Sequence, residues 1–250
     1  MIRILTLIFF ITSSITAEAK DTIVGGFSSK NISINTTFTG SKILIFGSIK
    51  RNNAEKITPS HIIIEVLGPR TNITIRKKKK TFGIWINSHP IKIYNSPSFY
   101  SLLFTDKPEK ILAQAELKNT LIGKKQFFDP QNNKQSYIDA INAKIRIKIK
   151  EGSYIFHNDP IALKDETLFS AQVSLPANLI QGDYKTKIHL VQNGKVISSF
   201  TDIIKVRKIG IEKWLYQMAH EQSLFYGLFS IFLALFFGWS ASTLFRKFQK

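Results

Sequence analysis

The chain has 250 residues, 44% of them hydrophobic, and a formal net charge of +18, so it is long and apolar enough to bury a hydrophobic core. It contains no cysteine, which excludes a disulfide framework, a thiolate nucleophile, a cysteine-ligated metal site and a lipidated cysteine. Residues 20–245 carry 31 basic and 16 acidic side chains, about +15, but the lysines are dispersed and lie on no nucleic-acid-binding module, so no nucleic-acid partner is expected.

The first 19 residues have the pattern of a cleavable signal peptide. Arg3 is followed by an apolar run at 4–10, and the small-x-small triplet AEA occupies 17–19. The run is too short to span a hydrocarbon core of about 30 Å. We therefore predict cleavage and a mature N-terminus near Lys20.

Residues 21–104 consist of short β-branched segments separated by turn residues. The predicted strands are 42–50, 61–67, 72–76, 82–87, 91–94 and 99–104, with breaks at Gly68-Pro69, His89-Pro90 and Ser96-Pro97. Several strands at a spacing of roughly ten residues indicate an antiparallel sandwich or barrel.

The middle of the chain changes to helical periodicity. A helix is predicted from Asp106 as N-cap, with Pro108 in its first turn and Ile111, Ala115, Leu121 and Ile122 near one face. A second helix is predicted over 136–149, with a loose capping box at Ser136 and Asp139 and a stop at Gly152. The segment IRIKIK at 145–150 also alternates with period two, so a strand there stays open.

Strands return at 168–175, 183–191 and 195–206. Asn193-Gly194 between the last two supplies the positive φ angles of a two-residue type I′ hairpin. Tyr184, after Gly182-Asp183, is placed to bond back to an upstream backbone group, as in immunoglobulin-like sandwiches. We predict a mainly β ectodomain, an immunoglobulin-like antiparallel sandwich with one or two inserted helices.

The C-terminal part predicts a membrane anchor. Residues 224–245 are 22 residues without a formal charge, long enough as a helix to cross a bilayer. The expected layout is a signal peptide (1–19), a periplasmic ectodomain (20–208), a juxtamembrane amphipathic helix (209–223), a transmembrane helix (224–245) and a cytoplasmic basic tail (246–250). A disulfide-free exported domain fits a bacterial periplasm, so we expect a single-pass inner-membrane protein.

Few residues stand out as candidate sites. The five histidines lack metal-ligand spacing, and no nucleophile elbow, phosphate loop or dinucleotide fingerprint occurs, so no metal, cofactor or catalytic residue is nominated. Basic residues 76–80 could contact phosphate head groups or an anionic glycan, or could form a solvated hairpin tip. Trp85, with Tyr100 nearby, is a candidate interaction residue, whereas Ile84 and Ile86 are expected in the core.

A ridge of small residues runs along the predicted membrane helix. Ser230, Ala234, Gly238 and Ser242 recur every four residues and so share one face, beside a separate stripe of phenylalanines. Small residues let membrane helices approach closely. The ridge is therefore a candidate contact for a membrane-protein partner or for a second copy of the chain.

Several stretches in combination resemble the alphaproteobacterial transmembrane protein family of the Alph_Pro_TM type. They are FTGSKILIFGSIK (38–50), GPRTNITIRKKKKTFGIWIN (68–87), SPSFYSLL (96–103), SLPANLIQGDYKTKIHLVQNGKVI (174–197) and IGIEKWLYQMAHEQSLFYGL (209–228). The resemblance covers nearly the whole mature chain and implies an inner-membrane protein with a periplasmic domain. It carries no assigned activity, and it implies an accessory role beside permeases of the sulfite-exporter type.

The sequence therefore favours a non-enzymatic periplasmic interaction module that is accessory to another inner-membrane protein. One alternative is an anion-binding or substrate-delivery subunit, because the ectodomain is strongly basic. A second alternative is an envelope glycan hydrolase, which requires two carboxylates across a cleft, roughly 5 to 10 Å apart.

Overall fold

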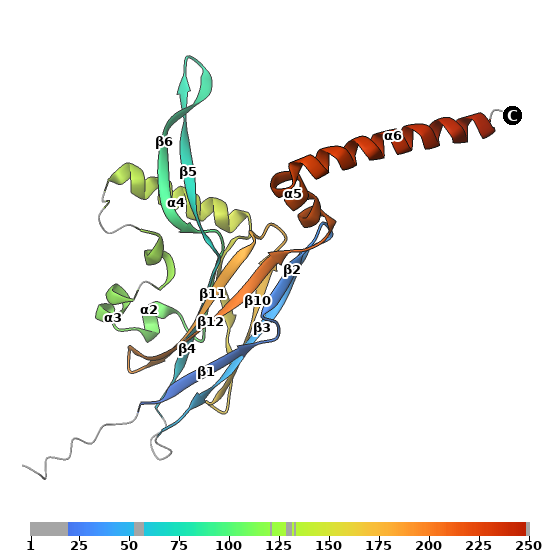
Figure 1. Ribbon diagram of the computed structural model, residues 1–250. Coiled ribbons are helices and arrows are strands. Elements are labelled where there is room, and N and C mark those ends of the chain that lie inside the picture. The colour runs from blue at the N-terminus through green and yellow to red at the C-terminus, as the bar shows by residue number, and fades with distance from the viewer. Residues whose placement is uncertain (1–19, 53–57, 121, 129–131, 133, 249–250) are drawn as a thin grey trace, which may run out of the picture.

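The β-rich part of the chain is a sandwich of two β-sheets with a helical layer on the outside of the larger sheet (Figure 1). The computed structural model describes residues 20–52, 58–120, 122–128, 132 and 134–248. The predicted signal peptide, residues 1–19, lies outside these residues. The mainly β, sandwich-like fold predicted from the sequence is confirmed.

Sheet A is the smaller sheet of the sandwich. In spatial order its strands are β1 (Thr22–Phe27), β3 (Gly40–Lys50), β10 (Leu168–Pro176) and β9 (Ala162–Lys164). All three pairings are antiparallel. The predicted strands 42–50 and 168–175 correspond to β3 and β10 and are confirmed to within two residues.

Sheet B has six strands and lies at the centre of the three layers. In order they are β2 (Asn31–Ile34), β12 (Lys195–Lys208), β11 (Gly182–Gln192), β4 (His61–Leu67), β7 (Tyr100–Phe104) and β8 (Tyr154–Pro160). Its two outermost pairings are parallel and the inner three are antiparallel. The sheet is therefore mixed.

Strand β4 shows why this sheet has a core on each side. Its sequence HIIIEVL is apolar at nearly every position, as expected of a strand covered on both faces. Ile62, Ile64 and Val66 join the core between the two sheets. Ile63 and Leu67 point the other way, into a second core beneath the helices.

The helical layer consists of α2 (Pro108–Ile111), α3 (Gln114–Asn119), the 3₁₀ helix η1 (Gly123–Phe127) and α4 (Gln135–Lys150). Two short helices thus replace the single helix predicted after Asp106, because Leu112 and Ala113 have extended backbone. Lys107, not Asp106, is the N-cap residue. Of the residues expected near one face of that helix, Ile111 and Ile122 are buried and Ala115 is exposed, while Leu121 lies outside the described residues.

The second predicted helix is confirmed as α4, and the open strand alternative for 145–150 is wrong. Ala140, Ile141 and Ile145 are buried against sheet B, so tertiary packing selects the helical period. Gly152 ends the segment with φ +71°. The capping box is not formed: Lys134 is the N-cap residue and makes no side-chain cap, while Asp139 accepts a hydrogen bond from Gln135 at 2.8 Å.

Two local predictions in the C-terminal half are confirmed. Asn193 and Gly194 both have positive φ, +50° and +75°, and form the two-residue turn between β11 and β12. The Tyr184 hydroxyl donates a hydrogen bond to the backbone oxygen of Ile180 at 2.9 Å. The turn sets the register of the β11–β12 hairpin. The Tyr184 hydrogen bond ties the start of β11 to the segment just before it.

A long two-stranded hairpin projects from the body. Strands β5 (Arg70–Thr81) and β6 (Ile84–Pro97) form it, in place of the three shorter strands predicted there. The expected breaks at Pro90 and Pro97 lie inside β6, which has β5 as its sole partner in the described sheet, so a missing N–H is tolerated. Figure 1 shows the hairpin rising beyond the sandwich.

The chain ends in two helices. The amphipathic helix α5 (Ile211–Glu221) is followed by α6 (Ser223–Phe248), and Trp214 packs edge-on against Phe229 with ring centroids 6.2 Å apart. Within α6, Ser223–Arg246 is long and apolar enough to cross a membrane, and its side chains are exposed to the surroundings. The predicted membrane helix is confirmed as a continuous helix.

Candidate functional site

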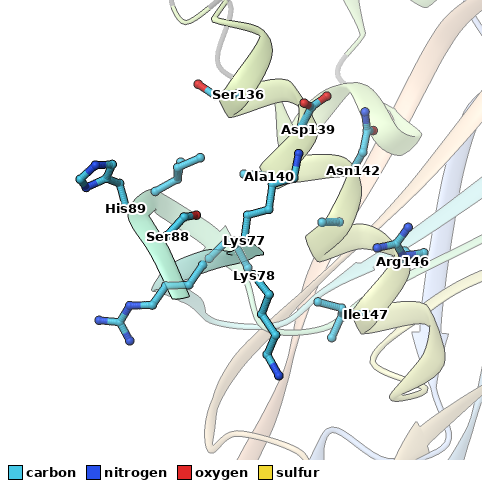
Figure 2. A pocket seen from close by; sticks show the side chains of 14 residues that line it. Lys77, Lys78, Ser88, His89, Ser136, Asp139, Ala140, Asn142, Arg146 and Ile147 are labelled. Atoms are coloured by element: carbon cyan, nitrogen blue, oxygen red, sulfur yellow. The ribbon is translucent and has the colours of Figure 1, made fainter. Parts of the chain in front are cut away.

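A groove separates the projecting hairpin from α4. Its volume is about 720 Å³. Figure 2 shows Lys77, Lys78 and His89 on the hairpin side, with Asp139, Asn142 and Arg146 on the α4 side. We call it the arm–helix groove, and residues 76–90 of the hairpin the arm.

Alternating isoleucines explain why the arm leaves the body where it does. Ile73, Ile75, Ile91 and Ile93 lie at paired positions of β5 and β6. Ile93 is buried, and Ile75 and Ile91 pack against the same core beneath α4. Beyond Arg76 no isoleucine of β5 continues the stripe, so the arm separates from the helix and the groove opens.

The groove is lined by both apolar and cationic side chains. The apolar ones come from both elements: Ile75, Ile91, Ala140, Ala143 and Ile147. The cationic ones are Arg76, Lys77, Lys78 and Arg146, whereas Asp139 is the single carboxylate of the described lining. Such a surface complements a segment that carries both aliphatic and acidic side chains.

A second cavity, of about 470 Å³, lies on the other side of α4 around Lys144. This lysine is 1% exposed, donates a hydrogen bond to Ser96 on β6, and lies over the rings of Phe127 and Tyr154 at 4.8 and 5.3 Å. Burial, with smaller contributions from Lys148 and Arg70, lowers the pKa of Lys144 to about 8.

The Lys144 cavity is basic. Arg70 and Lys92 line it together with Lys144, and no carboxylate is among its described lining residues. Its remaining polar groups include Asn95 and Asn132, which offer amide donors, whereas the Gln126 amide already donates to Glu65 and to the Gly123 oxygen. A small anion entering this space would meet positive charge and hydrogen-bond donors.

A buried polar network joins the helical layer to sheet B. Tyr100 donates a hydrogen bond to Glu65 at 2.6 Å, and the backbone N–H of Gly123 donates to the Tyr100 hydroxyl at 3.0 Å. Gln126 also contacts Glu65 at 3.3 Å, and His189 lies 3.5 Å from its other oxygen. Burial, and then the Glu65 charge, raise the pKa of Tyr100 well above its ordinary value.

The structure separates Trp85 and Tyr100, the two candidate interaction residues of the β-rich part. Trp85 is exposed on the arm, whereas Tyr100 is fully buried in the network with Glu65, so the two form no common aromatic face. Ile84 and Ile86 are exposed, and the prediction that they pack in the core is wrong. The basic run lies within β5, and the actual turn is Phe82-Gly83.

The small residues predicted to form a ridge all lie exposed on α6. They are Ser230, Ala234, Gly238 and Ser242, and nothing in the described chain lies within 4 Å of a Cβ built on Gly238. The Ser230 hydroxyl bonds back to the Tyr226 oxygen at 2.8 Å, which satisfies it within the helix. The ridge is therefore an open surface of the chain.

Lys144 and Glu65 were not among the candidate site residues, although the sequence carries a signal for each. Lys144 follows Ile141 by three residues, on the buried side of an amphipathic helix. Glu65 is the single acidic residue of a strand that is otherwise almost entirely apolar. A charged residue at a core-facing position requires buried partners, and both have them.

No group of three or more His, Asp or Glu residues able to hold a metal ion occurs in the described ranges. The two cavities beside α4 present one carboxylate, Asp139, in their described lining. The described lining of these cavities therefore lacks the second carboxylate that a glycan hydrolase with paired carboxylates requires.

Comparison with protein families gives one match. The family described as "Putative transmembrane protein (Alph_Pro_TM)" matches residues 22–247, which is nearly the whole described chain. No curated protein matches the sequence. The chain belongs to this transmembrane protein family, and the resemblance noted in its sequence is confirmed.

Proposed function

We propose that this family member is a non-enzymatic interaction module, held by α6 in a bacterial inner membrane with its ectodomain in the periplasm. In this proposal the arm–helix groove binds an acidic, partly aliphatic segment of another integral membrane protein, such as a permease. In this proposal α6 holds the protein at the membrane, the sandwich carries the binding surface, and the groove selects the partner.

The observation that carries the proposal is the composition of the groove. Four cationic side chains line the groove together with five apolar ones, and Asp139 is the single opposing charge of the described lining. A volume of about 720 Å³ is within the range of ligand-binding clefts, so it accommodates a few side chains of a partner segment. Charge complementarity would orient the segment, and burial of its aliphatic side chains would hold it.

The proposed orientation rests on the ends of the chain. Arg246, Lys247 and Lys250 follow the apolar span, as expected for a cytoplasmic tail, and a cleaved N-terminal signal would place the ectodomain outside. The immunoglobulin-like assignment of the sandwich is supported by the Tyr184 hydrogen bond to Ile180. The small-residue ridge of α6 would contact a partner helix or a second copy.

Site-specific photo-crosslinking in intact membranes tests the groove. A photoreactive amino acid at Asn142, which is exposed in the groove, is expected to give a discrete adduct with an integral membrane protein. The matched control is the same amino acid at Lys195, which is exposed at the opposite end of β12 from α5. Identical adducts from both positions, or none from Asn142, would reject the groove as the binding surface.

A second candidate function, anion binding for delivery to a permease, is favoured by the Lys144 cavity. Its three cationic side chains face no carboxylate in the described lining. Calorimetric titration with sulfate and with phosphate is expected to show binding that weakens with added salt and as pH rises through about 8, where Lys144 loses its proton. Lys144→Met should abolish the binding, whereas Lys164→Met on the exposed edge strand β9 should not. No heat of binding at low salt would reject this candidate.

A further inference from the structure

The outer end of the arm combines exposed apolar side chains with a row of lysines. Phe82 is 102% exposed, Ile84 65%, Trp85 66% and Ile86 43%. We call these four residues the tip. On the opposite strand, Lys79 pairs with Ile86 and Lys80 pairs with Trp85, so the positive charges lie directly beside the tip.

The charge of this segment has no ion-pair partner among the described residues. Residues 76–80 are five consecutive cations. Like charges on adjacent residues repel one another, and an external negative surface relieves that repulsion.

Phe82 is an unfavourable residue for its position in the folded chain. It takes the first place of a two-residue turn with φ +49°, where Asn, Asp or Gly is preferred, and Gly83 follows with φ +84°. No packing in the ectodomain compensates, because the side chain is fully exposed. A large aromatic residue placed here gains stabilisation only from something outside the chain.

From these observations we infer that the tip inserts into the head-group layer of an anionic phospholipid bilayer, with Lys79 and Lys80 contacting the lipid phosphates. Trp and Phe favour the interface between water and hydrocarbon, and lysines beside them reach anionic head groups. The ligand class is therefore an anionic phospholipid surface, which the tip contacts in addition to the anchor α6.

The arm is long enough to reach a surface away from the body, but Figure 1 shows it pointing in a different direction from α6, so contact with the membrane that α6 spans requires α6 to turn. From Arg76 to Thr81 it extends about 17 Å beyond the packed isoleucines, at about 3.4 Å per residue. Figure 1 shows the arm leaving the body at the end where β12 passes into α5. Gly210 before α5 and Gln222 before α6 have non-helical backbone, so residues 209–210 and the single residue Gln222 are the joints that set the direction of α6 relative to the arm.

Tryptophan fluorescence of the full chain in lipid nanodiscs tests the inference. The chain has three tryptophans, so Trp214→Phe with Trp239→Phe leaves Trp85 as the sole reporter. In nanodiscs of phosphatidylcholine mixed with phosphatidylglycerol, we expect a blue-shifted Trp85 emission that brominated lipids quench. In phosphatidylcholine alone, and in high salt, quenching should fall, because the lysines then lack an anionic surface.

Two sets of variants separate insertion from folding. Phe82→Asn suits the turn better, so it should leave stability equal or higher while bromolipid quenching of Trp85 decreases. Lys79→Glu with Lys80→Glu should lower the inserted fraction by about tenfold or more, given a contribution of about 1 kcal/mol per basic residue near an anionic surface. Lys164→Glu with Lys195→Glu is the charge-matched control, at two exposed positions away from the arm, and should leave quenching unchanged.

The inference is overturned if Trp85 stays accessible to aqueous quenchers with and without phosphatidylglycerol, or if quenching is equal in both lipids. It is also overturned if Trp85 is shielded only when another membrane protein is co-reconstituted, since the tip would then bind protein. Lys79, Lys80 and the tip do not line the arm–helix groove, so either result leaves the proposed partner site to its own test.

Discussion

Lys144 on α4 donates a hydrogen bond to the hydroxyl of Ser96 on β6, inside the protein. The two residues are 48 positions apart in sequence, and the bond ties the helix to the base of the hairpin. The helix α4 and the hairpin form the two walls of the arm–helix groove. This buried contact therefore holds α4 in place as one wall of the proposed binding surface.

The pH dependence of stability should reveal the Lys144 contact. The pKa of Lys144 is about 8 in the folded protein, below its ordinary value of 10.5. Between these values the unfolded chain binds more protons, so the free energy of unfolding should rise with pH from about 8 to 10. Lys144→Met should remove this rise, which we expect to be about 1 to 3 kcal/mol.

Denaturant unfolding at several pH values between 7 and 10 makes this comparison, with Lys150→Met as a control for an exposed lysine of the same helix. The raised pKa of Tyr154 and Tyr184, about 12 each, lowers stability only above about pH 10 and so lies outside the window. Parallel curves for wild type and Lys144→Met would show that this lysine keeps its charge.

Tyr184→Phe should destabilise the sandwich by about 1 kcal/mol, because it removes the hydrogen bond to the Ile180 oxygen and keeps the buried ring. Chemical denaturation is the measurement. Tyr94→Phe on the exposed face of β6 is the matched control and should be neutral. A Tyr184→Phe protein as stable as wild type would mean that water replaces the bond fully.

Gly194→Val should cost roughly 1 kcal/mol or more, because a β-branched residue resists the φ of +75° found there. A Cβ at this position would also lie 3.2 Å from the backbone nitrogen of Ala113. Asn193→Gly keeps the turn type and should change stability little. Equal midpoints of thermal unfolding for Gly194→Val and wild type would contradict the strain at this turn.

The small-residue ridge of α6 predicts an effect on helix association. Because the chain has no cysteine, Ser230→Cys introduces a single reporter for disulfide cross-linking between two copies in membranes. Gly238→Ile should reduce the cross-linked fraction by filling the ridge, and Phe236→Leu on another face should not. Unchanged cross-linking in Gly238→Ile would leave α6 as an anchor without this contact.

Much of the strand pattern could be predicted because it depends on residues that are close together in the sequence. The run HIIIEVL at 61–67 coincides with β4, and the Asn-Gly pair marks the last hairpin, since β-branched residues and left-handed turn residues act within a few positions. The small residues of α6 can be assigned to one helical face from the sequence because the helical repeat is fixed.

The candidate site could not be predicted because it depends on contacts between distant segments. Pro90 reads as a break, yet β6 continues through it because β5 alone pairs with that strand. Tyr100 reads as a surface aromatic, but the helical layer covers it and Glu65 accepts its hydrogen bond. Periodicity also does not show that α4 packs beside the hairpin base, which is what creates the groove.

The most direct test of the proposed partner site is charge reversal at Arg146, measured by the yield of the adduct that a photoreactive residue at Asn142 forms in intact membranes. Arg146 is exposed on the groove rim, so Arg146→Glu should leave the fold intact and repel an acidic segment. We predict a loss of most of the adduct, restored when an acidic residue of the cross-linked segment is changed to lysine. An adduct of unchanged yield in Arg146→Glu would contradict the proposal that the arm–helix groove binds an acidic membrane-protein segment.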